Sequence, residues 1–290
     1  MKCELCPRRC GVDRAAGKGY CGCGENAVVA HHMLHYWEEP CISGTRGSGC
    51  VFFAGCQLKC VYCQNRAISR AETGKEYDTR SLAALFLSLQ NEGAHNINLV
   101  TPDHFAPQIC AALEEAKKQG LIIPVVYNCS GYVLPQTLKD AAKYIDIYLT
   151  DFKYMSNELA FRYSACRDYP EKAKEALEEM VREHPSRAYA EDGTMRSGVI
   201  VRHLILPGHT EDSKRVIEYL HKTYGNAIQI SIMNQFTPIG LESYPEINRR
   251  LTTLEYDRVV GYALSIGVEN AYIQQKGTAS ESFIPDFFGK

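Results

Sequence analysis

Three cysteines follow one another in a short stretch of the sequence, GCQLKCVYCQN, which runs from Gly55 to Asn65. Cys56, Cys60 and Cys63 have the spacing Cys-x3-Cys-x2-Cys, and the stretch contains no fourth cysteine. Four thiolates complete a structural metal site or the ligand set of a [4Fe–4S] cluster. Three predict a [4Fe–4S] cluster in which one iron is left open for a non-protein ligand. An open position is typical of catalytic rather than structural metal centres.

The ligand that fills such a position in radical chemistry is S-adenosylmethionine, through its amino and carboxylate groups. The reduced cluster would pass one electron to the sulfonium, and the C–S bond would break to give methionine and a 5′-deoxyadenosyl radical. This radical abstracts a hydrogen atom from a substrate. Two other interpretations stay open: a zinc site with a distant fourth ligand, and a non-catalytic iron–sulfur protein that carries electrons or senses redox state.

Ten of the thirteen cysteines lie in the first 63 residues. An odd number cannot all form disulfides, and cytosolic thiols are kept reduced, so this clustering predicts metal binding. The N-terminal segment is too short to fold by hydrophobic burial alone, and a bound metal would stabilise it. Thiolates suit either zinc or an auxiliary iron–sulfur cluster. The tentative ligands of this second site are Cys3, Cys6, Cys10 and Cys21.

The elements that must position the three cysteines are read from the rest of the chain. Near-continuous apolar runs predict strands at 50–55, 97–102, 122–131, 145–153, 199–206 and 227–236. Helical periodicity predicts helices at 79–93, 107–120, 134–143, 211–222 and 253–266, and the long connection 154–198 contains a further amphipathic helix and a hairpin turn at Asp192-Gly193. Apolar strands that alternate with helices predict an α/β fold with a parallel, barrel-like sheet. We expect a partial (β/α)6 barrel at 49–290, after a small cysteine-rich metal-binding extension at 1–48. The three-cysteine loop follows the first of these strands and so belongs at the C-terminal mouth, where barrel chemistry occurs.

Several stretches resemble the radical S-adenosylmethionine superfamily, whose signature is Cys-x3-Cys-x-aromatic-Cys; they are CVYCQN, ELCPRRCGVDR, LVTPDH, TDFKYMSNELAFRYS and RHLILPG. Within it, the chain is most similar to uncharacterised relatives of the pyruvate formate-lyase activating enzyme. The resemblance implies a partial barrel of the radical SAM type, a [4Fe–4S] cluster and S-adenosylmethionine as cofactors, and a flavodoxin- or ferredoxin-type reductant. It favours a protein or peptide substrate, including a glycyl-radical enzyme to be activated, over a small molecule.

The resemblance also implies contacts to S-adenosylmethionine. Tyr62, the aromatic residue of the signature, would lie beside the adenine. Asp151 and Lys153 match an Asp-x-Lys pair that contacts this ligand, and they leave the same face of a strand because they are two residues apart. Arg202 matches an arginine that reaches the ligand carboxylate or ribose.

Other candidates for the lumen come from neighbouring segments. Asn128 and Ser130 share one face of the third predicted strand, 122–131, and are expected to line the same lumen. Glu38 and Glu39 precede Pro40 and could approach the site, although no spacing indicates it.

One position departs from the activating enzymes, which carry Gly-Gly-Glu to hold the methionine amino group. Here the sequence reads VTPDH at 100–104. Thr101, Asp103 and backbone carbonyls are therefore the candidate oxygen ligands for the ammonium. The chain also lacks a cysteine-rich ferredoxin-like insertion after the loop.

Composition excludes some classes of partner. The net charge of −2 over 290 residues indicates no bulk attraction to nucleic acid or membrane. No apolar run approaches the roughly 20 residues that a membrane helix needs, and the N-terminus lacks the apolar core of a signal peptide. We expect a cytoplasmic protein.

Overall fold

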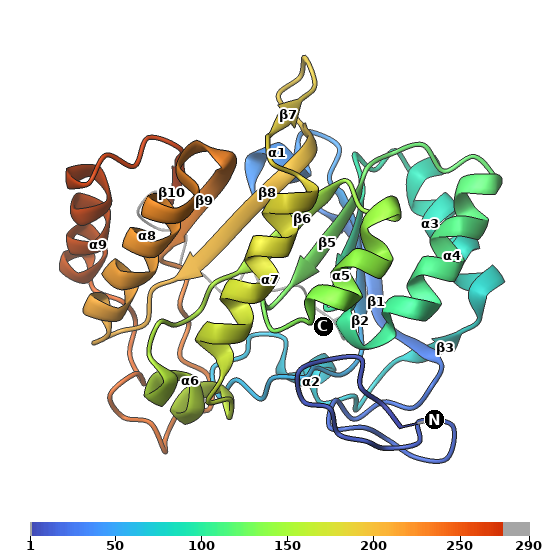
Figure 1. Cartoon of the computed structure of the whole chain (residues 1–290), viewed down its shortest axis with the longest axis horizontal. Coiled ribbons are helices and arrows are strands. Elements are labelled where there is room, and N and C mark those ends of the chain that lie inside the picture. The colour runs from blue at the N-terminus through green and yellow to red at the C-terminus, as the bar shows by residue number, and fades with distance from the viewer. Residues whose placement is uncertain (1, 275–290) are drawn as a thin grey trace.

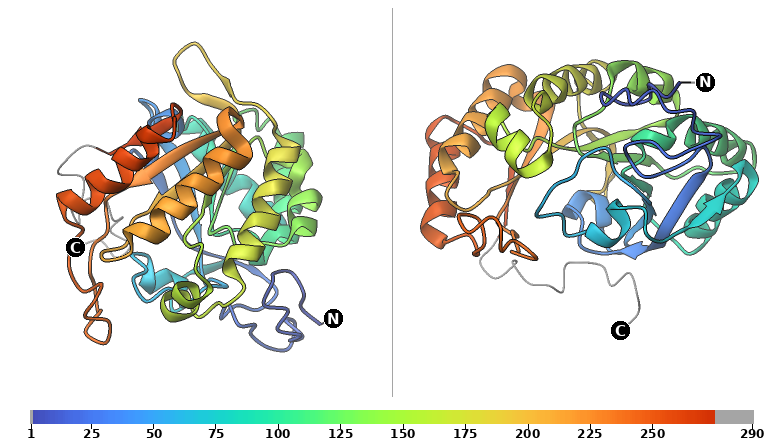
Figure 2. Two further views of the ribbon diagram at one scale, coloured as in Figure 1. Left: turned by 60° about the vertical axis from the view of Figure 1, so that its left-hand side comes forward. Right: turned by 90° about the horizontal axis from the view of Figure 1, so that it is seen from below.

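Within residues 2–274, ten strands form one mixed sheet that curves into an open barrel (Figures 1 and 2). The computed structural model describes residues 2–274. The strand order is β10-β9-β8-β6-β5-β4-β2-β1-β3, with the short β7 paired to β8. The strands are β1 (Ala27–His35), β2 (Ser48–Phe53), β3 (Lys75–Tyr77), β4 (Ile97–Val100), β5 (Val125–Cys129), β6 (Ile147–Asp151), β7 (Ala188–Tyr189), β8 (Met195–Leu204), β9 (Ile228–Met233) and β10 (Ala271–Ile273).

The neighbours from β10 to β2 all pair in parallel, whereas β1 runs antiparallel to both β2 and β3. Six strands of the parallel part are each followed by a helix that covers the outer face of the sheet (Figure 1). The predicted partial (β/α)6 barrel is therefore confirmed. The covering helices are α3 (Thr79–Asn91), α4 (Ala106–Lys118), α5 (Pro135–Ala141), α7 (Tyr169–Glu183), α8 (Thr210–Tyr224) and α9 (Thr253–Ser265).

The two-residue period of a strand decides which side chains face the lumen. On β6, Tyr148 belongs to the large core under the helices, whereas Leu149 belongs to a separate apolar cluster inside the barrel. Asp151 lies two residues after Leu149 and therefore shares its inner face. The same alternation places Asn128 on the inner face of β5 and Arg202 on the inner face of β8.

The segment between β1 and β2 fills the barrel at the end where the parallel strands begin. Its short helix α1 (Pro40–Ser43) includes Ile42, which is fully buried against Val126, Leu149 and Ile200. The predicted domain boundary between residues 48 and 49 remains a prediction; β1 lies on its N-terminal side and is nevertheless a strand of the main sheet.

The opposite end of the barrel carries the loops that follow the strands. In Figure 1, α2 (Arg66–Ser69), α6 (Asn157–Ser164) and the N-terminal segment lie at the lower edge, toward which β5 and β8 point. The long connection contains the predicted helix, observed as α7, and the predicted hairpin, observed as the β7–β8 pair. The sequence did not predict α6, which begins where the Ser156 hydroxyl accepts a hydrogen bond from the backbone N–H of Leu159. No helix within residues 2–274 has the length and apolar character to cross a bilayer.

Candidate active site

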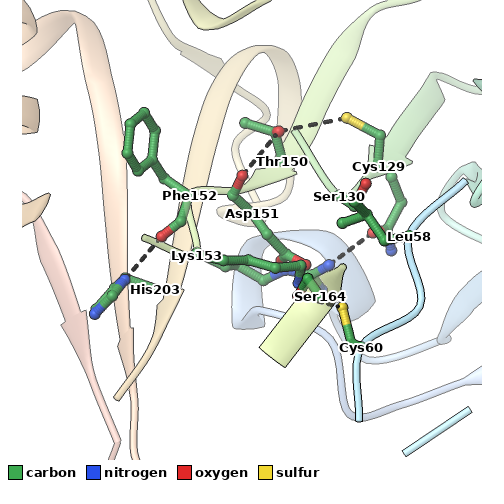
Figure 3. Close-up of polar contacts among 12 residues, drawn as sticks. Leu58, Cys60, Cys129, Ser130, Thr150, Asp151, Phe152, Lys153, Ser164 and His203 are labelled. Atoms are coloured by element: carbon green, nitrogen blue, oxygen red, sulfur yellow. Dashed lines mark hydrogen bonds and ion pairs between the residues drawn. The ribbon is translucent and has the colours of Figure 1, made fainter. Parts of the chain in front are cut away.

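The three-cysteine loop leaves the C-terminal end of β2, a strand that is buried along its whole length. Cys56, Cys60 and Cys63 line one cavity of about 250 Å³. The backbone N–H of Leu58 lies 3.4 Å from Sγ of Cys56. Oγ of Ser164 lies 2.9 Å from Sγ of Cys60 (Figure 3). The far wall of the cavity comes from the ends of β5, β6 and β8. The loop therefore faces the inner side chains of the barrel across a single cavity.

The donor set of this loop fits a [4Fe–4S] cluster. Burial, and then the proximity of Cys60 and Cys63, raise the pKa of the Cys56 thiol. Burial also raises the pKa of Cys60, although the Lys153 ammonium opposes this. Cys56 and Cys60 therefore resist ionisation on their own, and a cationic metal core would remove this penalty and hold the cysteines as thiolates.

Arg202 is the centre of the polar network on the opposite wall. Its Nε donates to Oδ1 of Asp151 at 3.0 Å, its Nη2 to Oδ1 of Asn128 at 2.7 Å, and its Nη1 to Oε2 of Glu38 at 3.1 Å. The pairing of β6 with β8 places Asp151 directly beside Arg202 in register. Lys153 completes the group, with its Nζ 2.5 Å from Oδ2 of Asp151. The structure thus joins four residues that the sequence predicted for the site in one network: Asn128, Asp151, Lys153 and Arg202.

Mutual pairing keeps these groups charged inside the protein. Burial alone would raise the pKa of Asp151, but Lys153 and Arg202 together hold it below its usual value. Burial likewise disfavours the charged form of Lys153, yet Asp151 and the Cys60 sulfur raise its pKa. The side chains of Asp151, Lys153 and Arg202 are only 24%, 18% and 15% exposed. The wall therefore presents fixed charges of both signs to the cavity.

Glu38 is a member of this network that the sequence did not assign. It reaches Arg202 from the segment just before α1, and its Oε1 lies 3.3 Å from Nδ2 of Asn98 and 3.4 Å from Nδ2 of Asn128. Glu39 is also buried. Burial disfavours the charged form of Arg202, but the carboxylate of Asp151 and, to a smaller extent, that of Glu39 raise its pKa. Two adjacent acids before a proline were the only signal in the sequence, because Asn98, Asn128 and Arg202 lie sixty or more residues away from Glu38 along the chain.

The other predicted lumen residues also lie at the cavity. Ser130 and Tyr62 both line it, together with Asn128. Oγ of Ser130 is buried and has no hydrogen-bond partner among residues 2–274. The ring of Tyr62 packs against Phe236 with centroids 5.8 Å apart. The contact of Tyr62 with adenine stays a prediction.

A chain of hydroxyl groups connects Tyr62 to Cys60 of the same loop. The Tyr62 hydroxyl lies 2.6 Å from that of Tyr154, which lies 2.8 Å from Oγ of Ser164, which in turn lies 2.9 Å from Sγ of Cys60. A thiolate can only accept, so when Cys60 binds metal Ser164 must donate to it and Tyr154 can donate to Ser164. Tyr154 and Ser164 belong to TDFKYMSNELAFRYS, one of the stretches named for their resemblance, but nothing in the sequence predicted this chain of hydrogen bonds.

Thr101 and Asp103 have different surroundings. Thr101 lines the cavity with a φ of 60°, which is uncommon for a β-branched residue and costs backbone strain. Asp103 is fully buried, and its carboxylate accepts hydrogen bonds from Gln57 at 2.5 Å and from Tyr127 at 3.1 Å. Burial raises the pKa of Asp103 to about 6, against the effect of these two donors. Its carboxylate is occupied inside the core, so Thr101 is the better placed of the two for a ligand in the cavity.

The N-terminal cysteines gather near the loop but outside the cavity. Cys3 lies near Cys10, and Cys6 lies near Cys3 and Cys21. The assignment of Cys3, Cys6, Cys10 and Cys21 as a second metal site stays a prediction.

Comparison with known proteins places this arrangement in a family. The sequence profile of the Radical SAM superfamily matches residues 50–220. The uncharacterised protein MJ0674 of Methanocaldococcus jannaschii is 29% identical over 279 residues, which cover 93% of this chain and 76% of that protein.

Solved structures show a similar fold at low sequence identity. SuiB of Streptococcus suis bound to S-adenosylmethionine gives a TM-score of 0.51 at 14% identity, covering 77% of this chain and 49% of SuiB. SuiB bound to its precursor peptide SuiA gives 0.50 at 12% identity, covering 77% and 47%. HydG, a maturase of the [FeFe]-hydrogenase, gives 0.51 at 15% identity, covering 79% and 52%. The chain therefore spans about half the length of the solved structures that it matches.

The superfamily profile covers more than half of the chain, and the three cysteines of its signature face a cavity with charged walls. The chain belongs to the radical SAM superfamily, whose cofactors are a [4Fe–4S] cluster and S-adenosylmethionine.

Proposed function

We propose that this radical SAM enzyme binds its cluster through Cys56, Cys60 and Cys63 and abstracts hydrogen from a protein or peptide. The observation that carries the proposal is one cavity lined both by these cysteines and by the charged group of Asp151, Lys153 and Arg202. When bound, the cluster and S-adenosylmethionine supply a one-electron cleavage of the sulfonium C–S bond that yields a 5′-deoxyadenosyl radical.

The charged wall suits a zwitterionic ligand. Nζ of Lys153 makes one hydrogen bond, to Asp151, among the described residues, although an ammonium has three donors. It can therefore take a ligand carboxylate while it keeps Asp151. Arg202 holds Asp151 from the other side and fixes its position. The free hydroxyl of Ser130 offers a further contact on the same wall.

The competing function is that of an electron carrier or redox sensor. Such a protein needs a cluster but no cavity lined with paired charges beside it. Neither Asp151 nor Lys153 could be buried in its charged form without the other, and an electron carrier has no need for such a buried pair. The charged cavity therefore favours an enzyme.

The substrate class rests on resemblance. SuiB has a similar fold and a structure bound to its precursor peptide. The activating enzymes, which the sequence also resembles, act on proteins. Because VTPDH stands in place of Gly-Gly-Glu, activation of a glycyl-radical enzyme is the less supported form of the proposal. A flavodoxin- or ferredoxin-type protein is the proposed reductant.

The first prediction concerns cleavage of the cofactor. Protein reconstituted with iron and sulfide without oxygen, then reduced with dithionite, should convert S-adenosylmethionine to 5′-deoxyadenosine and methionine, measured by chromatography and mass spectrometry. The Cys60→Ala protein is the control and should form neither product. If the wild-type cluster is intact and reduced by electron paramagnetic resonance but 5′-deoxyadenosine is absent, the enzyme proposal is wrong.

The second prediction concerns the substrate. A lysate from cells grown in deuterated medium is divided by ultrafiltration, and each fraction is supplied to the reduced enzyme. Deuterium should enter 5′-deoxyadenosine from the macromolecular fraction, because the abstracted hydrogen comes from a protein or peptide. Short peptides pass the filter, so the filtrate is also tested after peptidase digestion. Label that comes only from the filtrate and survives digestion would point to a small molecule.

The third prediction concerns Asp151. Asp151→Ala removes the group that holds Lys153 and Arg202, so the dissociation constant for S-adenosylmethionine should rise roughly 10- to 100-fold, the equivalent of about 1.5–3 kcal/mol for a charged hydrogen bond. Calorimetry measures binding, and iron analysis should give an unchanged content. Asp140→Ala, at an exposed position of α5, serves as the matched control. Loss of iron in Asp151→Ala would show that the residue supports the fold rather than the ligand.

The fourth prediction concerns the hydroxyl beside Cys60. Hydrogen bonds to cluster sulfurs stabilise the more negative, reduced state and raise the reduction potential. Ser164→Ala should lower the potential by roughly 20–60 mV, which corresponds to the net 0.5–1.5 kcal/mol of one hydrogen bond. Redox titration followed by electron paramagnetic resonance measures it, and Ser164→Thr should restore it. An unchanged potential in Ser164→Ala would mean that the hydroxyl does not donate to the cluster.

A further inference from the structure

A second group of metal-binding side chains lies beside the three-cysteine loop, outside the cavity. Sγ of Cys21, Sγ of Cys23 and a ring nitrogen of His104 all lie within 4.8 Å of one another. These residues are 7%, 3% and 2% exposed. The two cysteines come from the N-terminal segment, and His104 comes from the short 3-10 helix Asp103–Phe105 after β4. The group therefore joins the N-terminal segment to the barrel.

One ring nitrogen of His104 is engaged in a hydrogen bond and the other is open. Nε2 of His104 lies 2.7 Å from the carbonyl oxygen of Ala54, so it carries the proton and donates. Nδ1 is then left with a lone pair, and it is buried without a hydrogen-bond partner in the described part of the chain. Metal-binding histidines commonly donate one ring N–H to a carbonyl, which fixes the tautomer and frees the other nitrogen for the metal. A buried, unpaired ring nitrogen is otherwise costly.

A fourth sulfur is close to this group. A β-carbon built on Gly19 would lie 3.4 Å from Sγ of Cys10 and 3.5 Å from Sγ of Cys21. Both sulfurs therefore lie close to Gly19, and the absence of a side chain at this residue leaves space between them. Cys10 can complete a set of four ligands.

We propose that Cys10, Cys21, Cys23 and His104 bind one zinc ion. Three thiolates and one imidazole form a closed tetrahedral set that is typical of structural zinc. Tetrahedral zinc keeps its ligand atoms roughly 3.5–3.8 Å apart. The ligand atoms of Cys21, Cys23 and His104, all within 4.8 Å of one another, need only small movements, whereas the Cys10 side chain must turn toward them to complete the set. Compared with the set expected from sequence, Cys23 and His104 take the places of Cys3 and Cys6.

The site would anchor the cluster loop. The backbone N–H of Cys56 lies 3.3 Å from the carbonyl oxygen of Cys21. A β-carbon on Gly55 would lie 2.6 Å from that same oxygen and 2.6 Å from Sγ of Cys23, so no larger residue fits there. Zinc at this position fixes the backbone from which the first cluster ligand extends. The proposal does not depend on the reaction that the enzyme catalyses.

Metal analysis tests the assignment. The full-length protein is produced with both metals supplied, and zinc and iron are measured separately by mass spectrometry. Wild type should contain about one zinc per chain. Cys23→Ser and His104→Asn should each reduce zinc at least about tenfold, since each removes one of four ligands. Cys110→Ser, a thiol on α4 outside the group, should keep zinc, and the Cys56, Cys60 and Cys63 triple alanine variant should lose iron and keep zinc.

Four results would overturn the assignment. The first is zinc retained in both Cys23→Ser and His104→Asn, and the second is zinc lost only in Cys3→Ser and Cys6→Ser. The third needs no variant and uses wild-type protein loaded with cobalt in place of zinc. It is an absorption spectrum that lacks both the thiolate charge-transfer bands and the intense visible bands of tetrahedral cobalt. A second iron–sulfur cluster in place of zinc would appear as extra iron in the triple variant and would also contradict the proposal.

Discussion

The buried guanidinium of Arg202 sets the geometry of the cavity wall. Each of its three nitrogens has a partner on a different part of the chain: β6, β5 and the segment before α1. Removing one partner of a buried ion pair typically costs about 3–5 kcal/mol, because the remaining charge is left uncompensated. The register of β6 against β8 and the position of the segment inside the barrel are therefore coupled through one side chain.

The sulfur side of the cavity is held in a different way, by α6. The backbone N–H of Val61 donates to the carbonyl of Tyr163 at 2.8 Å, and that of Lys59 lies 3.4 Å from the carbonyl of Ser164. The last carbonyls of a helix have no partner within it, so the end of α6 is available to hold the loop. The Ser164 hydroxyl then reaches Cys60. Ser164 thus supplies both a backbone acceptor for the loop and the hydroxyl beside the Cys60 sulfur.

Sequence patterns predicted the parts of this molecule that depend on local order. The apolar runs located the parallel strands, and the two-residue period placed Asp151 and Lys153 on one face. The spacing of three cysteines indicated the cluster. The contacts that were missed join residues far apart in the chain. Glu38 meets Arg202 only because α1 lies inside the barrel, and Ser164 meets Cys60 only because α6 ends beside the loop. His104 approaches Cys21 because the chain turns into a 3-10 helix after β4, and that same turn takes Asp103 away from the lumen.

The position of Glu38 has a consequence for how the chain can be shortened or recombined. Residues 1–48, which the sequence predicts to be a separate extension, supply two parts of the barrel. They are strand β1, which lies between β2 and β3, and Glu38, which pairs with Arg202. A barrel cut at residue 49 would keep every signature cysteine and yet lose the Glu38 partner of Arg202 and the α1 side chains that pack inside the barrel. The two regions are therefore expected to have been inherited together, as one evolutionary unit rather than a catalytic module with an exchangeable accessory.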